Sequence, residues 1–205
     1  MANGSHRLVV KAPGHDRRYM AVFWHRRDLR TADDQGLAKA ADDGPLLPFF
    51  VRDDDVLAHA SPVRVAFLLD ALAALRGRYR ALGGDLLVVR GDPADALVGI
   101  ADEHGEDRVV WSADYSDLAR RRDDRVRDAL GSAGLEGETV HDALLHEPGT
   151  VRTNAGDPYQ VFGPFERKWR SRAKADPVDE PDPIAAVEGE PLPSRDDLGF
   201  DEPGV

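Results

Sequence analysis

The chain has 205 residues, of which 41% are hydrophobic, so it can bury one good core with extensions but not two full domains. It contains no cysteine, which excludes a disulfide framework, thiolate zinc ligands and thiol nucleophiles. The formal net charge of -11 argues against high-affinity nucleic-acid binding by the chain alone, because a duplex is itself densely anionic.

The first elements are strands and helices in alternation. Residues 1–19 are polar and lack periodicity, so we expect a disordered extension or tag there. From residue 20 onward, short apolar runs predict strands at 20–24, 46–51, 85–90, 108–111 and 138–141. The middle runs are nearly continuous in Leu and Val, as strands buried on both faces of a parallel sheet require.

The helices between these strands have recognisable ends. Ser61 followed by Pro62 predicts the N-cap and first turn of a long helix, which Gly83 and Gly84 end. Further helices are predicted to start at Asp92 and at Ser116 or Asp117. This alternation indicates an α/β fold, a Rossmann-like, doubly wound, five-stranded parallel sheet over residues 20–145.

The pattern changes after residue 145. Residues 146–174 predict a small hairpin, with strands at 151–153 and 159–162, and then a short basic helix at 164–174. Phe165 and Trp169 are spaced by one turn of that helix and are expected to be exposed, as a surface awaiting a partner would be. Residues 175–205 are acidic and rich in proline, which predicts an interdomain linker.

Charged residues follow the strands where a ligand site is expected. In an open parallel sheet, ligands bind beyond the carboxyl ends of the strands. Arg26, Arg27 and Arg30 follow the first strand and Asp114 follows the fourth, so these side chains could grip a planar polar ligand. The alternative is a network of arginines and aspartates that only fixes the loops.

Several other kinds of site lack support. The sequence has no G-x-G-x-x-G after the first strand, no Walker loop and no G-x-S-x-G elbow. The histidines lack the spacing of a zinc enzyme, so no metal site is expected. The basic stretch at 120–127 alternates with aspartates and is interpreted as a solvated helix face. The basic stretch at 167–174 has fewer acidic residues to balance its charge. It could be a solvated helix face, or it could face a phosphate backbone or a partner domain.

Several strings resemble one family in the order that the family has them. Residues 23–30 read FWHRRDLR, which resembles the opening signature of photolyases and cryptochromes. Residues 159–169, YQVFGPFERKW, resemble a later segment of the same family. Between them lie the further matches Ser61, Pro62, Arg64, Gly91, Asp92, Pro93, Arg122 and Asp123. The resemblance spans about residues 20–172.

The resemblance implies the N-terminal light-harvesting domain of a deoxyribodipyrimidine photolyase. In that family, FAD and the light-driven repair of cyclobutane pyrimidine dimers belong to a C-terminal helical domain. We expect that domain to be absent from this chain and to be its partner, with UV-damaged DNA bound only by the full-length protein. Whether the chain alone is an enzyme stays open. Alternatives are a cryptochrome-type blue-light sensor module and a stand-alone flavin- or nucleotide-binding module.

The resemblance also indicates which antenna pigment to expect. Folate-binding members carry an Asn-Glu pair where this sequence has Leu118 and Ala119. The FWHRRDLR string and a small residue at 119 are more similar to members that bind an 8-hydroxy-5-deazaflavin-type antenna, which typically have Gly there; an empty site is the alternative. The candidate pigment-binding residues are Arg26, Arg27, Asp28, Phe50, Val51, Asp114 and Ala119.

The remaining expectations concern the environment of the protein. No apolar run approaches the ~18 residues of a membrane span and no secretory signal is present, so we expect a cytoplasmic protein without membrane contact. The acidic composition, with 27 basic residues of which only four are Lys, suggests a halophilic source. GC-rich coding alone would also favour Arg over Lys.

Overall fold

A five-stranded, all-parallel sheet forms the centre of the molecule. The computed structural model of the chain describes residues 20–42 and 44–200, and the extension expected at 1–19 lies outside them. The strand order is β3-β2-β1-β4-β5, and every neighbouring pair is parallel. The strands are β1 (Ala21–His25), β2 (Leu46–Arg52), β3 (Leu87–Arg90), β4 (Arg108–Ser112) and β5 (Glu136–Val140). The predicted doubly wound α/β fold is confirmed.

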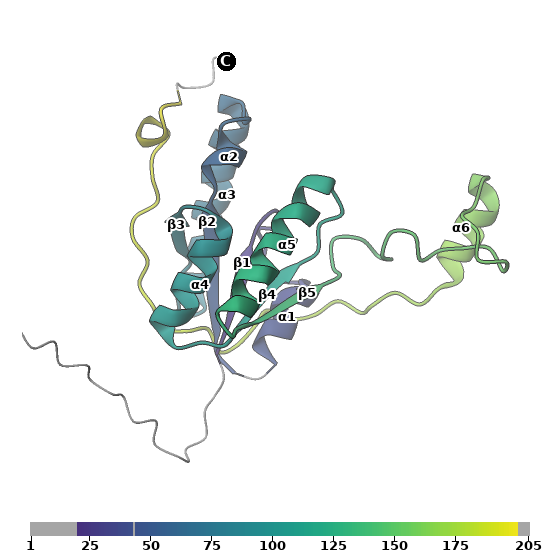
Figure 1. Ribbon diagram of the computed structural model, residues 1–205, viewed down its shortest axis with the longest axis horizontal. Helices are drawn as coiled ribbons and strands as arrows, with labels where there is room; N and C mark the ends of the chain where they lie inside the picture. Colours follow the sequence, from purple (N-terminus) through teal and green to yellow (C-terminus); the bar gives the residue numbers. More distant parts are fainter. Residues whose placement is uncertain (1–19, 43, 201–205) are drawn as a thin grey trace, which may run out of the picture.

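Helices cover both faces of this sheet (Figure 1). Helices α1 (Gln35–Ala41) and α3 (Pro62–Ala81) pack on one face, in a core that includes Phe23 and Leu72. Helices α4 (Pro93–His104) and α5 (Asp117–Ser132) pack on the other, in a core that includes Trp24 and Trp111. Burial on both faces explains why the strand sequences are nearly continuous in apolar residues.

The N-terminal caps follow the expected residues with one exception. The Asp92 side chain accepts a hydrogen bond from the Ala94 amide at the start of α4, and Ser116, not Asp117, caps α5. Ser61 occupies the N-cap position of α3, but in the described structure its side chain makes no capping hydrogen bond. Pro62 still starts that helix, because its fixed φ suits the first turn. A short helix, α2 (Asp54–Leu57), was not expected and follows β2 directly.

All five strands differ from their expected bounds by one or two residues at an end; β5, for example, begins at Glu136 instead of residue 138. Two of these differences have a clear physical cause. His25 belongs to β1 instead of the loop after it, and its side chain is buried. Strand β3 starts at Leu87, because Asp85 is used as an anchor: its carboxylate accepts hydrogen bonds from the guanidinium of Arg76 and from the Leu86 amide. The sheet therefore begins two residues later at this edge than the sequence suggests.

The predicted hairpin after residue 145 is wrong in detail. A single antiparallel bridge joins Arg152 to Pro158, and no strand forms at 159–162. Helix α6 runs over Phe162–Ser171, so it begins and ends earlier than expected. It ends early because the Lys174 ammonium donates to the carbonyl oxygens of its last turn and beyond, which competes with further helix. Phe165 and Trp169 are half-buried instead of fully exposed.

The acidic segment at 175–200 lies against the sheet domain. It crosses from the side of α6 to the β3 side, as the yellow trace in Figure 1 shows. The Leu46 amide of β2 donates a hydrogen bond to the Pro183 carbonyl, and the Leu46 carbonyl accepts one from the Ala185 amide. Ile184 and Ala185 are buried. The domain boundaries proposed at 145 and 174 stay predictions. The apolar residues of this segment, few as they are, contribute to the core of the domain.

No helix among residues 20–42 and 44–200 is long and apolar enough to cross a bilayer.

Candidate functional site

A cavity of about 260 Å³ lies beyond the carboxyl ends of β1 and β2, where the loops after β1 and β4 meet. Strand β1 connects to β2 on one side and pairs with β4 on the other, so this is the point where the strand order reverses. The lining includes six of the seven predicted residues: Arg26, Arg27, Phe50, Val51, Asp114 and Ala119. The arginine loop and the acidic loop therefore share one crevice, as expected.

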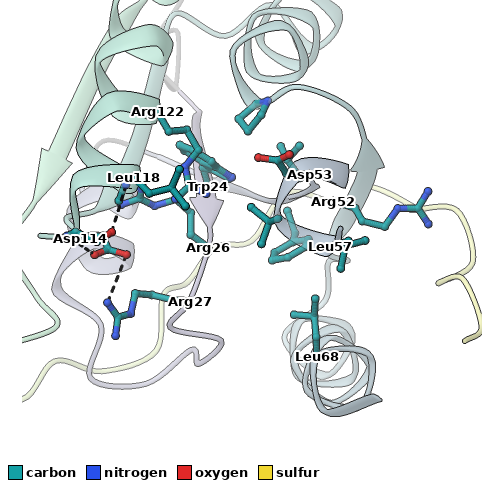
Figure 2. A pocket seen from close by; sticks show the side chains of 16 residues that line it. Trp24, Arg26, Arg27, Arg52, Asp53, Leu57, Leu68, Asp114, Leu118 and Arg122 are labelled. Atoms are coloured by element: carbon teal, nitrogen blue, oxygen red, sulfur yellow. Dashed lines mark hydrogen bonds and ion pairs between the residues drawn. The ribbon is translucent and has the colours of Figure 1, made fainter. Parts of the chain in front are cut away.

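The two walls of this cavity, which we call the pocket, differ in character (Figure 2). One wall is polar and carries Arg27, Asp114 and Arg122. The opposite wall includes the apolar side chains of Leu57 of α2 and Leu68 of α3, and it also carries Arg52 and Asp53. A slot with one apolar face and a few polar groups fits a flat aromatic molecule with a polar edge.

Arg26 belongs to the framework of the pocket. Its side chain is 5% exposed, and its guanidinium donates to the Asp123 carboxylate and to the Ser112 carbonyl. Asp123 also accepts a hydrogen bond of 3.1 Å from the Trp111 indole. Burial lowers the pKa of Arg26, and the charge of Asp123 opposes that shift. The alternative interpretation, a network of arginines and aspartates that fixes the loops, therefore describes Arg26 in this structure.

Arg27 faces the opening and is free to meet a ligand. Its side chain is 59% exposed, and its guanidinium lies 3.4 Å from the Asp114 carboxylate. Burial opposes ionisation of Asp114, but hydrogen bonding with Ser116 and the charge of Arg27 outweigh it and hold the pKa of Asp114 below its usual value. The rim of the pocket therefore carries an ionised Asp114 carboxylate and an exposed Arg27 guanidinium.

Arg122 is a pocket residue that the sequence analysis did not select. Its guanidinium carbon lies 5.2 Å from the centre of the Trp24 ring. Its Nε is buried and has no hydrogen-bond partner among the described residues. A signal was available, because Arg122 follows Ala119 by three residues and so shares its helix face. The apolar wall was also missed, since α2 was not predicted.

Asp28 and Arg30 lie away from the pocket. The Asp28 carbonyl lies 3.2 Å from Nδ1 of His25, which turns the loop back on itself. The guanidinium of Arg30 pairs instead with Asp142 and donates to the Asp33 carbonyl. The loop after β1 therefore divides its charges, with Arg26 and Arg27 on the pocket side. Asp28 does not line the pocket, and its carboxylate lies 3.6 Å from the Arg30 guanidinium; a role of Asp28 in ligand binding stays a prediction.

Comparisons with known proteins agree on one family. The family model of DNA photolyase matches residues 21–184. The deoxyribodipyrimidine photo-lyase of Halobacterium salinarum is 54% identical over 200 residues, which cover 90% of this chain and 42% of that protein. The one from Synechococcus sp. (strain ATCC 27144) is 36% identical, over 89% of this chain and 41% of its own length.

Solved structures show the same relationship. A class III photolyase from Agrobacterium tumefaciens is similar with a TM-score of 0.75 and 28% identity, over 90% of this chain and 38% of that one. A photolyase from Sulfolobus tokodaii has the same fold, with a TM-score of 0.71 and 21% identity, over 88% of this chain and 41% of that one.

The parallel sheet, with a pocket at its switch point, is that of a doubly wound, Rossmann-like α/β domain. This chain belongs to the DNA photolyase family. It spans about two fifths of the length of the curated photolyases given above.

Proposed function

We propose that the pocket binds a deazaflavin-type antenna pigment, and that the chain is the light-harvesting domain of a deoxyribodipyrimidine photolyase. The observation that carries this proposal is the meeting of the Arg27 and Asp114 loops in one crevice with an apolar far wall. An antenna needs a site that holds a planar chromophore in a defined orientation, and it needs no nucleophile or general base.

The residues present suit such a pigment. The apolar wall of Leu57 and Leu68 suits a flat ring system, and the unpartnered Nε of Arg122 offers a donor to a carbonyl or anionic edge. Polar donors and acceptors at the rim, from Arg27 and Asp114, suit the heteroatoms of a deazaflavin. When bound, the pigment would supply absorption of light, and the protein would supply orientation and shielding from water.

A folate antenna has weaker support. Leu118 and Ala119 stand where folate-binding members carry an Asn-Glu pair. Both side chains are hydrocarbon, so neither can provide the directional hydrogen bonds that a pterin ring requires. We therefore expect a reduced folate to bind more weakly than a deazaflavin.

We infer the activity of the whole protein by analogy with the family. We expect a C-terminal helical domain to hold FAD, to receive excitation from the antenna and to repair cyclobutane pyrimidine dimers in UV-damaged DNA. A cytoplasmic location stays a prediction. A cryptochrome-type photosensor is the second candidate, because Cryptochrome-1 of Arabidopsis thaliana is also 31% identical over 80% of this chain.

A ligand titration tests the pocket. The purified chain is titrated with 8-hydroxy-5-deazariboflavin, with FAD and with a reduced folate, and binding is followed by fluorescence. FAD is included because the photolyase from Sulfolobus tokodaii was solved with two FAD molecules. We expect the deazaflavin to bind most tightly. Replacement of Arg27 by Ala should weaken its binding roughly tenfold, since a charged hydrogen bond is lost.

The matched control is Arg121→Ala, which removes an exposed arginine of α5 that does not line the pocket. Its affinity for the deazaflavin should equal that of the unmodified chain. Preferential binding of the folate would contradict the pigment assignment, and an unchanged affinity of Arg27→Ala would remove that residue from the site.

A further inference from the structure

Trp24 brings an electron-rich aromatic ring to the pocket. It lies at the end of β1, lines the pocket and is 2% exposed. The centre of its ring system is 6.0 Å from that of Trp111. Excited flavin-type chromophores readily oxidise a tryptophan in contact with them. An antenna placed against Trp24 therefore risks losing its excitation before it can pass it on.

The loss would be a single electron transfer. The indole of Trp24 would give one electron to the excited pigment and become a radical cation. The electron would then return to the indole, and the excitation would be released as heat. Trp111 could prolong this loss by passing an electron to Trp24, because its N–H is hydrogen-bonded to the Asp123 carboxylate, which can accept the proton.

Two cations flank the ring where the radical cation would form. The guanidinium carbons of Arg26 and Arg122 lie 4.9 Å and 5.2 Å from the centre of the Trp24 ring, and Figure 2 shows both side chains beside it. Repulsion between like charges grows in a buried, poorly screened site, so each guanidinium disfavours a positive charge on the indole.

The negative charge nearby offsets that of Arg26. Asp123 is held by the Arg26 guanidinium and by the Trp111 indole. Arg122 has no ion-pair or hydrogen-bond partner among the described side chains, so its charge is uncompensated beside Trp24. The cluster of Trp24, Arg26, Arg122 and Asp123 thus carries one net positive charge.

We propose that Arg122, beside the ion pair of Arg26 with Asp123, protects the bound pigment from electron transfer by raising the oxidation potential of Trp24. The inference rests on the proposed function, since it requires a pigment in the pocket. It assigns to Arg122 a photophysical role in addition to the hydrogen-bond donor that its Nε offers to the ligand. Arg122 is the residue to test, because removal of Arg26 would leave the Asp123 carboxylate buried without its cation.

The experiment measures the fluorescence lifetime of 8-hydroxy-5-deazariboflavin bound to the chain. The variants are Arg122→Gln, Arg122→Lys, Trp24→Phe and the double variant Trp24→Phe with Arg122→Gln. Arg121→Gln is the matched control, because it removes a neighbouring charge of α5 outside the pocket. Lifetimes are recorded at saturating protein, so a change of affinity does not affect them.

We expect Arg122→Gln to shorten the lifetime by a factor of about ten, because the barrier to oxidation of Trp24 falls. Arg122→Lys and the control should keep the original lifetime. The double variant should restore it, since the electron donor is gone. A merely structural Arg122 would change the free energy of unfolding without this rescue.

Other outcomes overturn the proposal. An unchanged lifetime in Arg122→Gln shows that the charge offers no protection, and a shortened lifetime that Trp24→Phe does not restore shows a different quencher. If Arg122→Gln fails to fold, Trp24→Phe alone decides: a lifetime several-fold longer than in the unmodified chain means that Trp24 is not protected. If the unmodified chain binds no pigment, the proposed function itself fails. If the pigment binds but the lifetimes follow one of the outcomes above, only the protective role of the arginine fails.

Discussion

Two buried ionisable residues, one at the end of β1 and one at the start of α1, have shifted pKa values. His25 is 1% exposed, and its Nε2 lies 2.6 Å from the Tyr79 hydroxyl. Because a carbonyl can only accept, Nδ1 of His25 donates to Asp28 and Nε2 accepts from Tyr79. Burial lowers the pKa of His25 to about 4, so the ring stays neutral at physiological pH. The second residue, Asp34, caps α1, and burial raises its pKa to about 6.

These two shifts have opposite effects on stability as the pH changes. His25 binds its proton less readily in the folded chain, so its contribution to stability is lost as the pH falls from 6.5 toward 4. Asp34 binds its proton more readily in the folded chain, so its contribution is lost as the pH rises from 3.8 toward 6. Over the range they share, the two contributions largely cancel.

Replacement of Asp34 by Asn should therefore reveal the slope that His25 produces. Asn keeps the capping acceptor for the Leu37 amide but does not titrate. Between pH 4.5 and 6.5, the free energy of unfolding should rise by about 2 kcal/mol more in this variant than in the unmodified chain. Urea denaturation at both pH values measures the difference. Equal slopes in the two proteins would show that the pKa of Asp34 is not raised.

At the scale of elements, the close contact between the end of α3 and the C-terminal segment is the notable feature. A Cβ atom on Gly84 would lie 2.3 Å from Cγ2 of Ile184 and 2.6 Å from the Ala185 carbonyl oxygen. The same segment is held by Arg76, whose guanidinium bonds both to Asp85 and to the carbonyls of Gly189 and Glu190. A glycine is needed here because backbone and side chain approach so closely.

Substitution of Gly84 by Ala should displace the C-terminal segment. We expect the free energy of unfolding to fall by about 1–3 kcal/mol, because the added methyl group overlaps with Ile184 and Ala185. Amide exchange of Ala185, whose N–H bonds to the Leu46 carbonyl at 2.7 Å, should become faster. Urea denaturation and hydrogen exchange measure the two effects.

The matched control lies on the same helix. Gly77 of α3 is exposed, and a Cβ atom there meets nothing within 4 Å. Gly77→Ala should stabilise the chain by about 0.5–1 kcal/mol, because Ala restricts the unfolded chain and favours helix. If Gly84→Ala behaves like this control, the contact between α3 and the C-terminal segment is not tight.

For the whole molecule, the dominant property is its negative charge. The chain carries 38 acidic and 27 basic residues, which gives a formal net charge of -11. Repulsion among these charges disfavours the compact state, and salt screens it. The similar photolyase of Halobacterium salinarum comes from a salt-loving organism, which fits this composition.

The free energy of unfolding should accordingly rise as KCl is increased from about 0.1 M to about 1 M, because the screening length shortens to about a third. Chemical denaturation with urea, which is uncharged, measures it at each salt concentration. Sucrose serves as the control, since it favours burial without screening charge. Full stability in low salt would contradict the expectation of salt adaptation.

Much of the fold was predictable from local patterns. The apolar runs, the caps at Asp92 and Ser116 and the strings shared with photolyases depend on neighbouring residues, so the sequence alone specified the sheet, most helices and the family. The same holds for Arg27 and Asp114, because the carboxyl ends of adjacent parallel strands must lie at one edge of the sheet.

What the tertiary structure decided concerns contacts between distant residues. Only the packed fold shows that Arg26 is paired with Asp123, that Arg122 lies over the Trp24 ring and that Asp28 faces Arg30. It likewise places Ile184 in the core although its segment resembles a free linker. Burial, pairing of charges and ring stacking depend on three-dimensional distance, which local periodicity does not encode.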